Sequence, residues 1–286
     1  MSVPTRQDLL TDADELANSL GDPQLRILDC RFDLMQPAAG RAAWLEAHIP
    51  GAVYADLDKD LSGPVRADTG RHPLPEPERA VETFSRLGID GGTRVVVYDD
   101  SSGAIASRAW WLLRWLGHPE VTVLDGGLQA WRSQDLALDS GVQEVVRRNF
   151  VASPGVARVL SSREVGADRP FALIDARDAV RFRGESEPID TKAGHIPGSM
   201  NLPFVDCLRE DGTWRDARAL RRCLQPLLGD DESAPWAVMC GSGVTACHLA
   251  ISGLLAGYRE PGVYVGSWSE WIRDPSRPIG SGPGNR

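Results

Sequence analysis

The sequence predicts an α/β protein built from two tandem homologous domains, each with a parallel central sheet flanked by helices. Three observations lead to this fold class. The chain has 286 residues, a length that suits two domains of ordinary size. Landmarks of the first half return in the same order in the second half. Each half also alternates short apolar runs with longer helical patterns, as repeated strand–helix units do.

The repeated landmarks show how the two halves correspond. Residues 27–31 resemble 173–177, the His-Ile-Pro-Gly of 48–51 returns at 195–198, the run 95–98 has a counterpart at 236–239, and Gly126 with Trp131 returns as Gly266 with Trp271. The first two landmarks repeat after 146 and 147 residues, and the last repeats after 140. The first half therefore carries seven extra residues (147 − 140), which we assign to the loop-like segment 63–73.

Strand and helix signals follow one another closely in each copy. Residues 94–98 form a short β-branched run that is typical of a buried parallel strand. Residues 104–116 then follow a helical pattern, and Gly117 is a C-cap residue. The second copy repeats this order with a strand at 237–239 and a helix at 244–256. Each copy is therefore expected to place a tight loop between a buried strand and a helix.

The domain boundaries follow from the repeat and from local composition. Residues 139–154 hold polar, glycine and proline residues, a composition typical of a linker. We expect an N-terminal domain over 1–140, a linker over 141–158 and a C-terminal, catalytic domain over 159–286.

Charge and composition exclude several functions. The formal net charge is −9, from 31 basic and 40 acidic residues, which argues against a nucleic-acid partner. No run approaches the ~18 apolar residues of a membrane span. Residues 1–20 hold four carboxylates and no long apolar stretch, so we expect no secretory signal. Five cysteines are too few for a disulfide framework, and we expect a cytoplasmic protein.

The two copies differ at the loop between the strand and the helix. At an offset of 140 residues, the segment 100–107 aligns with 240–247. Asp100 then stands where the second copy has Cys240. A carboxylate cannot act as a soft nucleophile, whereas a thiol can. We therefore expect the first domain to be catalytically inactive and the second domain to carry the chemistry on Cys240.

The surroundings of Cys240 suit a thiolate. Gly241 and Gly243 allow the backbone to curl so that several amide N–H groups point inward at the start of a helix. Ser242 and Thr245 add hydroxyl donors. Such an anion cradle favours a reactive thiolate and would also hold a persulfide anion. The competing interpretation, a buried and inert cysteine, fits the other four better: Cys30, Cys207, Cys223 and Cys247.

The residues quoted above carry a family resemblance. The Cys-Gly-Ser-Gly-Val-Thr-Ala-Cys of 240–247, the repeated His-Ile-Pro-Gly and the Gly-Ser-Trp of 266–268 resemble the two-domain rhodanese-like sulfurtransferases over nearly the whole chain. The cysteine loop is most similar to that of the 3-mercaptopyruvate sulfurtransferases. Thiosulfate sulfurtransferases typically have two basic residues after the cysteine, where this chain has Gly241 and Ser242. The resemblance implies two rhodanese-like domains and a ping-pong reaction through a Cys240 persulfide, without a metal or organic cofactor.

The resemblance also implies roles for individual residues. Arg181 matches an arginine that binds the donor carboxylate, and the loop residues that would surround the donor are Gly241, Gly243, Val244 and Thr245. A second arginine of such enzymes, after a Glu-Pro, is replaced here by Ile189. His72 matches a histidine that faces the cysteine loop, and Ser242 with His72 would relay a proton. The third member of that relay is left open, because Asp60 is only a weak candidate.

The expected partners are a small anionic sulfur donor and a thiol acceptor, such as a thioredoxin-like protein or a small thiol. The alternative donor is thiosulfate, with cyanide or a thiol as acceptor. A cysteine phosphatase is disfavoured because a Cys-x5-Arg loop would need arginine where this chain has Ala246. A non-enzymatic binding module remains a further alternative, and the presence of Cys240 argues against it.

Overall fold

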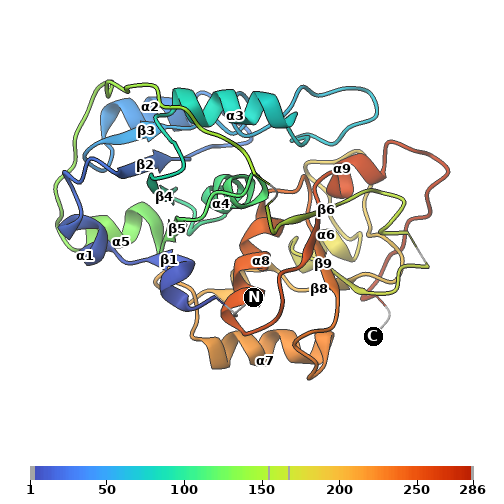
Figure 1. Cartoon of the computed structure of the whole chain (residues 1–286). Coiled ribbons are helices and arrows are strands. Elements are labelled where there is room, and N and C mark those ends of the chain that lie inside the picture. The colour runs from blue at the N-terminus through green and yellow to red at the C-terminus, as the bar shows by residue number, and fades with distance from the viewer. Residues whose placement is uncertain (1–3, 154, 167, 285–286) are drawn as a thin grey trace.

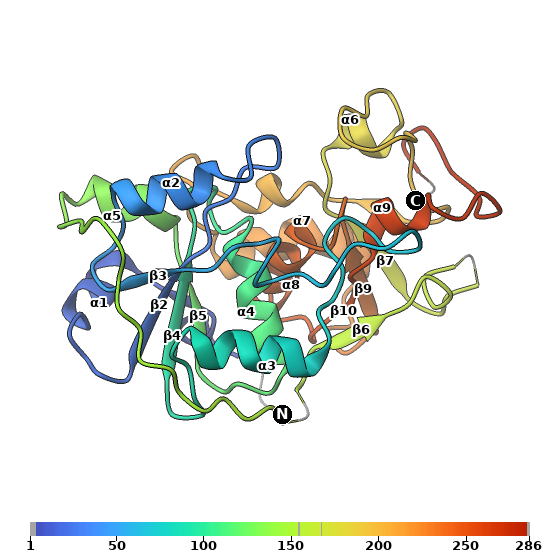
Figure 2. The ribbon, with the colours of Figure 1, turned by 90° about the horizontal axis from the view of Figure 1, so that it is seen from above.

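The computed structural model of the chain describes residues 4–153, 155–166 and 168–284. It contains two five-stranded sheets, and every strand pair in both is parallel. The two halves of the chain lie side by side, with helices α4 and α8 between the sheets (Figures 1 and 2). The predicted fold class is therefore confirmed.

The first sheet has the order β1-β5-β4-β2-β3. Its strands are β1 (Leu10–Thr11), β2 (Leu25–Asp29), β3 (Ala52–Tyr54), β4 (Arg94–Tyr98) and β5 (Val121–Leu124). Its helices are η1 (Arg6–Asp8), α1 (Ala13–Asn18), α2 (Ala39–Glu46), α3 (Pro77–Arg86), α4 (Ala106–Trp115) and α5 (Gly127–Ser133). Apolar residues of α3 and α4 cover one face of this sheet, and those of α1 and α5 cover the other.

The second sheet repeats this order as β6-β10-β9-β7-β8. Its strands are β6 (Arg158–Leu160), β7 (Ala172–Asp175), β8 (Met200–Asn201), β9 (Trp236–Met239) and β10 (Gly262–Tyr264). Its helices are α6 (Ala179–Phe182), η2 (Phe204–Cys207), α7 (Ala217–Leu228), α8 (Thr245–Leu255) and α9 (Ser267–Trp271). The identical strand order shows that the chain is a doubled structural unit.

The domain interface is formed by equivalent helices. Helix α4 packs against α8, and both are apolar and buried along most of their length. One apolar cluster includes Trp110 and Leu113 of α4 together with Leu249 of α8. The hydrophobic core is therefore continuous from one sheet to the other, which fixes the two domains against each other.

The strand register corrects the alignment of the two loops. Asp29 pairs with Tyr98, whereas the equivalent Asp175 pairs with Met239. Asp99 and Cys240 therefore follow equivalent strand ends, and their carbonyls accept equivalent hydrogen bonds from Leu128 and Trp268. The expectation that Asp100 takes the place of Cys240 is wrong by one residue. The first loop has one more residue before its glycine, so Asp100 is displaced outward and exposed.

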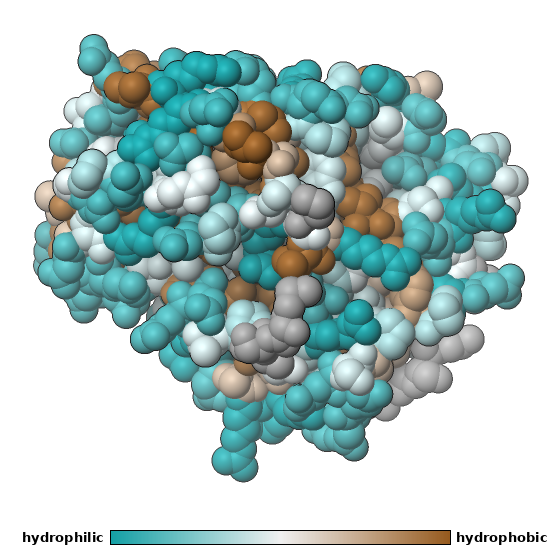
Figure 3. Space-filling model, in the orientation of Figure 1, coloured by the Kyte–Doolittle hydropathy of each residue, from teal (hydrophilic) through white to brown (hydrophobic). Residues whose placement is uncertain are grey.

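The two loops are named by their leading residues below, as the aspartate loop (99–105) and the cysteine loop (240–245). The face of the molecule in Figure 3 is largely hydrophilic, with small separate hydrophobic patches. Within the described residues, no helix combines the length and the apolar character needed to cross a membrane.

Candidate active site

A pocket with a volume of about 180 Å³ lies at the carboxyl end of the second sheet and is closed by the first domain. Carboxyl ends of parallel strands are the usual place for ligand sites in α/β sheets. The first domain contributes Phe32, Leu34, Leu57, Arg71, His72 and Ile105, and the second domain contributes Ala176, Arg177, Asp178, Arg181, Ile189, Phe204, Cys240, Gly241, Ser242, Val244 and Thr245. Both domains are therefore needed to build this site.

Cys240 lies at the base of the pocket, directly after β9, and is 2% exposed. The Gly243 N–H donates to the Cys240 Sγ at 3.1 Å. The backbone of Cys240 is held by the Ser267 hydroxyl, which accepts its N–H at 3.0 Å, and by the Trp268 N–H, which donates to its carbonyl. The thiol is thus presented to the pocket by a fully anchored backbone.

Gly243 is required by the shape of the cysteine loop. Its φ is +76°, and an added Cβ would lie 2.2 Å from the carbonyl oxygen of Val265. Only glycine combines this conformation with this close approach. Gly243 lies beneath the pocket, whereas Gly241, Val244 and Thr245 line it. The sharp turn brings the Gly243 N–H to the sulfur of Cys240.

Ser242 and His72 are in direct contact across the domain interface. The Ser242 Oγ and His72 Nδ1 atoms are 2.7 Å apart, and both side chains are buried. On the other side of the ring, Asp58 Oδ1 is 3.4 Å from His72 Nε2. A carboxylate only accepts hydrogen bonds, so Nε2 carries the proton and Nδ1 accepts from the Ser242 hydroxyl.

Asp58, and not Asp60, is therefore the carboxylate beside His72. Asp60 is instead held by the Arg86 guanidinium and by the N–H of Asp56. The sequence offers both carboxylates two residues apart, and only the turn after β3 decides which of them faces the histidine. Burial lowers the pKa of His72, while the hydrogen bond with Asp58 opposes this shift. The imidazole is therefore neutral at neutral pH.

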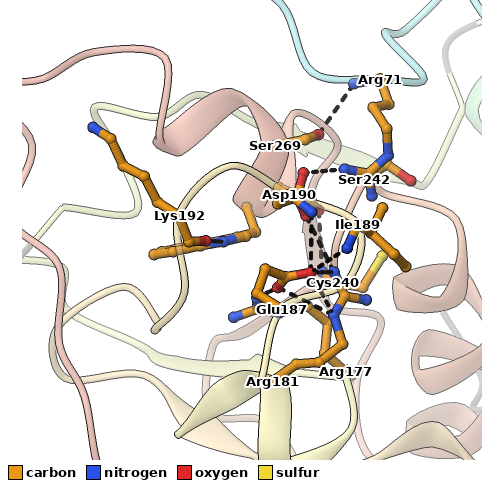
Figure 4. A network of polar contacts seen from close by, with 12 residues as sticks. Arg71, Arg177, Arg181, Glu187, Ile189, Asp190, Lys192, Cys240, Ser242 and Ser269 are labelled. Carbon is orange, nitrogen blue, oxygen red and sulfur yellow. Dashed lines mark hydrogen bonds and ion pairs between the residues drawn. The ribbon is translucent and has the colours of Figure 1, made fainter. Parts of the chain in front are cut away.

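Arg181 lies at the mouth of the pocket within a network of carboxylates (Figure 4). Its Nη2 is 2.7 Å from Glu187 Oε1 and 3.1 Å from Asp190 Oδ2. Burial acts to raise the pKa of Glu187, but the hydrogen bonds and charge of Arg181, together with the backbone N–H groups of Asp190 and Ile189, lower that pKa overall. Burial raises the pKa of Asp190, and Arg71 opposes this effect. Asp190 is therefore the carboxylate that is less firmly held as an anion.

Arg71 is a second guanidinium in the pocket, which the sequence reasoning missed. It comes from the segment between β3 and α3, and its backbone N–H donates to the Ser269 Oγ at 3.1 Å. Its side chain forms an ion pair with Asp190 of the other domain. An added Cβ at Gly241 would lie 2.9 Å from Arg71 Nη2 and 3.6 Å from Arg181 Nη2. Two guanidiniums thus flank the residue after Cys240.

Arg177 also borders the pocket but is held by a structural ion pair. It bonds Asp175 at 2.7 Å, and Arg31 bonds Asp29 at 2.6 Å in the equivalent place of the first domain. The guanidinium also lies 4.8 Å from the centre of the Trp268 ring. All five cysteines are free thiols, so Cys247 forms no disulfide with Cys240.

The aspartate loop wraps its backbone amides around the carboxylate of its own Asp99. The Asp99 carboxylate is completely buried and accepts four backbone N–H groups at 2.7 to 2.8 Å. Its Oδ1 receives the N–H groups of Ser101 and Gly103, and its Oδ2 receives those of Ile105 and Ala106. Gly103 corresponds to Gly243, which donates to the Cys240 sulfur.

In the part of the chain that the structure describes, no three His, Cys, Asp or Glu side chains come together in a way that could hold a metal ion.

The fold and the site define a class of protein: two repeated α/β domains that present one thiol, in an amide-lined loop, to a cationic pocket. The family described as Rhodanese-like domain matches residues 12–134 and 161–274. The chain belongs to this family, as its sequence predicts.

Named relatives are similar to this chain over most or nearly all of their length. A Pseudomonas aeruginosa protein named "Probable 3-mercaptopyruvate sulfurtransferase" is 45% identical over 96% of this chain and 98% of its own. A Mycobacterium tuberculosis protein named "Putative thiosulfate sulfurtransferase SseB" is 40% identical over 98% of this chain and 99% of its own. The structure of the 3-mercaptopyruvate sulfurtransferase from Leishmania major is similar with a TM-score of 0.83 and 32% identity, covering 96% and 77% of the two chains. These names agree with the predicted enzyme class, a sulfurtransferase.

Proposed function

We propose that this protein is a sulfurtransferase that moves sulfur from 3-mercaptopyruvate to a thiol acceptor through a persulfide on Cys240. One observation carries the proposal. The Cys240 sulfur accepts the Gly243 N–H at 3.1 Å and opens onto a pocket that contains the Arg71 and Arg181 guanidiniums. A thiol that faces a binding site for an anion is what sulfur transfer from an anionic donor requires. The activities in the names of two relatives support this assignment.

In the first half-reaction, the Cys240 thiolate attacks the sulfur of the donor. A sulfur–sulfur bond forms as the carbon–sulfur bond of the donor breaks, and the electron pair of that bond stays on the carbon as an enolate. Protonation of this carbon gives pyruvate. Cys240 then holds the outer sulfur as a persulfide, and no oxidant or reductant is needed.

Ser242 and His72 are suited to move the proton of the donor thiol. The Ser242 hydroxyl donates to the neutral His72 ring, whose other nitrogen is fixed by Asp58. Ser242 can take the proton of the donor thiol as it passes its own to His72. Reversing these steps delivers a proton to the enolate carbon. The same relay thus removes the proton of the donor thiol and protonates the carbon product.

Arg181 and Arg71 are suited to bind the carboxylate of the donor. Planar guanidiniums bind carboxylates with paired hydrogen bonds. In the free protein, both arginines share Asp190. We propose that the donor carboxylate displaces Asp190, while Glu187 continues to orient Arg181. Arg71 then supplies a second cation for the donor carboxylate, in a site where Ile189 replaces the second arginine of related enzymes.

The hydrogen bonds of the aspartate loop suggest how the cysteine loop would hold a persulfide on Cys240. Asp99 and a persulfide on cysteine have the same number of bonds from the backbone to the outer atom. The Asp99 Oδ2 accepts the N–H groups of Ile105 and Ala106. Their counterparts are Thr245 and Ala246, the first residues of α8, whose N–H groups have no carbonyl partner within the helix. We propose that these two amides hold the outer sulfur on Cys240.

In the second half-reaction, a thiol acceptor attacks the outer sulfur and releases the Cys240 thiolate. We propose a thioredoxin-like protein or a small thiol as acceptor, and the cytoplasm as the location. We also propose the division into a catalytically inactive domain (1–140), a linker (141–158) and a catalytic domain (159–286). The two sheets, which span residues 10–124 and 158–264, support this division.

Thiosulfate is the second candidate donor. Two guanidiniums beside Gly241 could also bind a dianion, and a relative that is 40% identical carries that name. The donors are distinguished by measuring kcat/KM for 3-mercaptopyruvate and for thiosulfate on one preparation. We expect 3-mercaptopyruvate to be preferred at least tenfold, because Gly241 and Ser242 leave the cysteine loop itself without a cation. A clear preference for thiosulfate would contradict 3-mercaptopyruvate as the donor, but not the proposed persulfide on Cys240.

A further inference from the structure

Arg108 is a completely buried guanidinium that reaches from α4 into the other domain. Its Nη1 donates to the Gly243 carbonyl at 3.2 Å. Its Nη2 donates to the carbonyls of His72 at 3.4 Å and Pro73 at 3.3 Å. Arg108 therefore links the backbone of the cysteine loop to the segment that carries His72.

The charge of Arg108 has no carboxylate partner in the part of the chain that the structure describes. Its hydrogen bonds go to backbone carbonyls and to the Cys247 thiol, and its guanidinium lies 5.7 Å from the centre of the Trp111 ring. By contrast, the buried Arg31 and Arg177 each bond an aspartate directly. A buried charge without a counterion is costly, so its retention calls for an anion that forms during function.

The other side of the interface is built differently. Counting from Gly103 and Gly243, His248 of α8 is the equivalent of Arg108 (103 + 5 and 243 + 5). His248 is equally buried, and burial lowers its pKa to about 3, so it is neutral. It stacks on Trp214 with ring centres 4.3 Å apart.

This asymmetry opposes a purely structural role for the cation. His248 lies beside the backbone of Ser102 in the aspartate loop, which contains a real carboxylate, yet it is uncharged. The buried positive charge instead lies beneath the loop that carries a thiol. If the charge served packing alone, the side with the carboxylate would be the more favourable place for it.

We propose that Arg108 is a positioning residue through which the first domain places a fixed positive charge beneath Cys240, and that this charge favours the thiolate and persulfide anions. The proposal rests on the proposed function only in taking Cys240 as the reacting group. Gly243 connects the two groups, since its carbonyl accepts from Arg108 and its N–H donates to the Cys240 sulfur. The hydrogen bond to this carbonyl also polarises the peptide that contains the Val244 N–H, at the edge of the pocket.

The electrostatic surroundings agree with this role. Burial lowers the pKa of Arg108, and the neighbouring thiols of Cys247 and Cys240 oppose that shift. Burial raises the pKa of Cys247 to about 12, so this thiol stays protonated and is not the counterion of Arg108. The other charged or titratable side chains that face Cys240 are Arg71, His72, Arg177, Asp178 and Arg181 in the pocket and Cys247 beneath it.

The test is the pH dependence of Cys240 alkylation by iodoacetamide, read by mass spectrometry on the full chain between pH 5 and pH 10. It needs no sulfur donor, so its outcome is independent of whether the chain transfers sulfur. For Arg108→Gln, and for Arg108→Met if the glutamine variant does not fold, we expect the midpoint to rise by about one unit or more, with alkylation about tenfold slower at pH 6. Arg108→Lys keeps the charge and should stay within about threefold of the unmodified protein.

His248→Gln is the matched control, because it changes the equivalent buried position on the side that faces the aspartate loop. Its alkylation profile should coincide with that of the unmodified protein. The proposal is overturned if a folded neutral variant keeps the original midpoint, if Arg108→Lys is as slow as the neutral variants, or if His248→Gln shifts the midpoint equally.

Discussion

At the scale of single residues, the site is a set of side chains from two domains that line one pocket with the Cys240 thiol. Sequence patterns predicted Cys240, Ser242, His72 and Arg181, and the structure brings them into one pocket. They did not predict Arg71, Asp58 or Arg108. All three belong to the first domain. Arg71 and Arg108 gain their place through the interface, where they bond Asp190 and the Gly243 carbonyl, whereas the turn after β3 places Asp58 beside His72. The only signal for Arg71 was its position next to His72.

Removing the guanidinium of Arg181 or Arg71 should weaken donor binding. For Arg181→Ala and for Arg71→Ala we expect kcat/KM for 3-mercaptopyruvate to fall about 10- to 100-fold, mainly through KM, because a charge-assisted hydrogen bond to the carboxylate is lost. Steady-state kinetics measure this. Arg183→Ala is the control, since that exposed guanidinium bonds only Glu185 among the described residues, and its kinetics should not change.

The carboxylate that supports His72 can be identified by a pair of variants. Burial lowers the pKa of His72 and the hydrogen bond with Asp58 opposes this shift, so the neutral ring becomes protonated only below the ordinary range near pH 6.5. The acid limb of the kcat profile should therefore lie below pH 6.5. Asp58→Asn removes the opposing effect, and the limb should move to lower pH while kcat falls about tenfold because the ring is no longer oriented.

Asp60→Asn serves as the comparison for Asp58→Asn, because Asp60 bonds Arg86 and faces away from His72. Its pH profile should match that of the unmodified protein. Equal effects of the two substitutions, or an acid limb unaffected by either, would contradict the assignment of Asp58.

At the scale of elements, strand, loop and helix are repeated, and the loops have diverged. The strand and helix patterns predicted β4 with α4 and β9 with α8 closely. The loops were aligned one residue out of register, because the aspartate loop has an additional residue before Gly103 and no local pattern marks an insertion in a loop of serine and glycine. Backbone pairing of β4 with β2 resolves the alignment and makes Asp99 the counterpart of Cys240.

Asp99 should be essential to the stability of the aspartate loop. Its carboxylate is buried and accepts four amide N–H groups, so Asp99→Ala leaves buried donors unpaired. We expect the free energy of unfolding in urea to fall by about 2 to 4 kcal/mol. Asp100→Ala, one residue away and exposed, should change it little. Similar losses of unfolding free energy for both variants would contradict the conclusion that Asp99 is the residue that stabilises the loop.

At the scale of the whole molecule, the first copy of the fold completes a pocket whose thiol lies on the second copy. The order of landmarks predicted the doubled architecture. It could not predict that α4 and α8 would share one core, because both helices are rich in apolar residues and could equally have been buried within their own domains.

A core that runs through both domains should unfold as one unit. We expect a single thermal transition by calorimetry, with equal calorimetric and van't Hoff enthalpies, because separating α4 from α8 exposes apolar side chains of both. Circular dichroism and tryptophan fluorescence should give the same midpoint. Two resolved transitions would show that the domains are stable apart and that the interface is weaker than this core implies.

The central claim is that Cys240 carries sulfur, and intact mass spectrometry after treatment with 3-mercaptopyruvate tests it most directly. We expect the mass of the protein to rise by about 32 Da, with the added mass localised to Cys240 by peptide mapping and removed by a thiol acceptor. Cys240→Ser should gain nothing, although four other cysteines remain. An unchanged mass for the unmodified protein, or an equal gain in Cys240→Ser, would contradict the account.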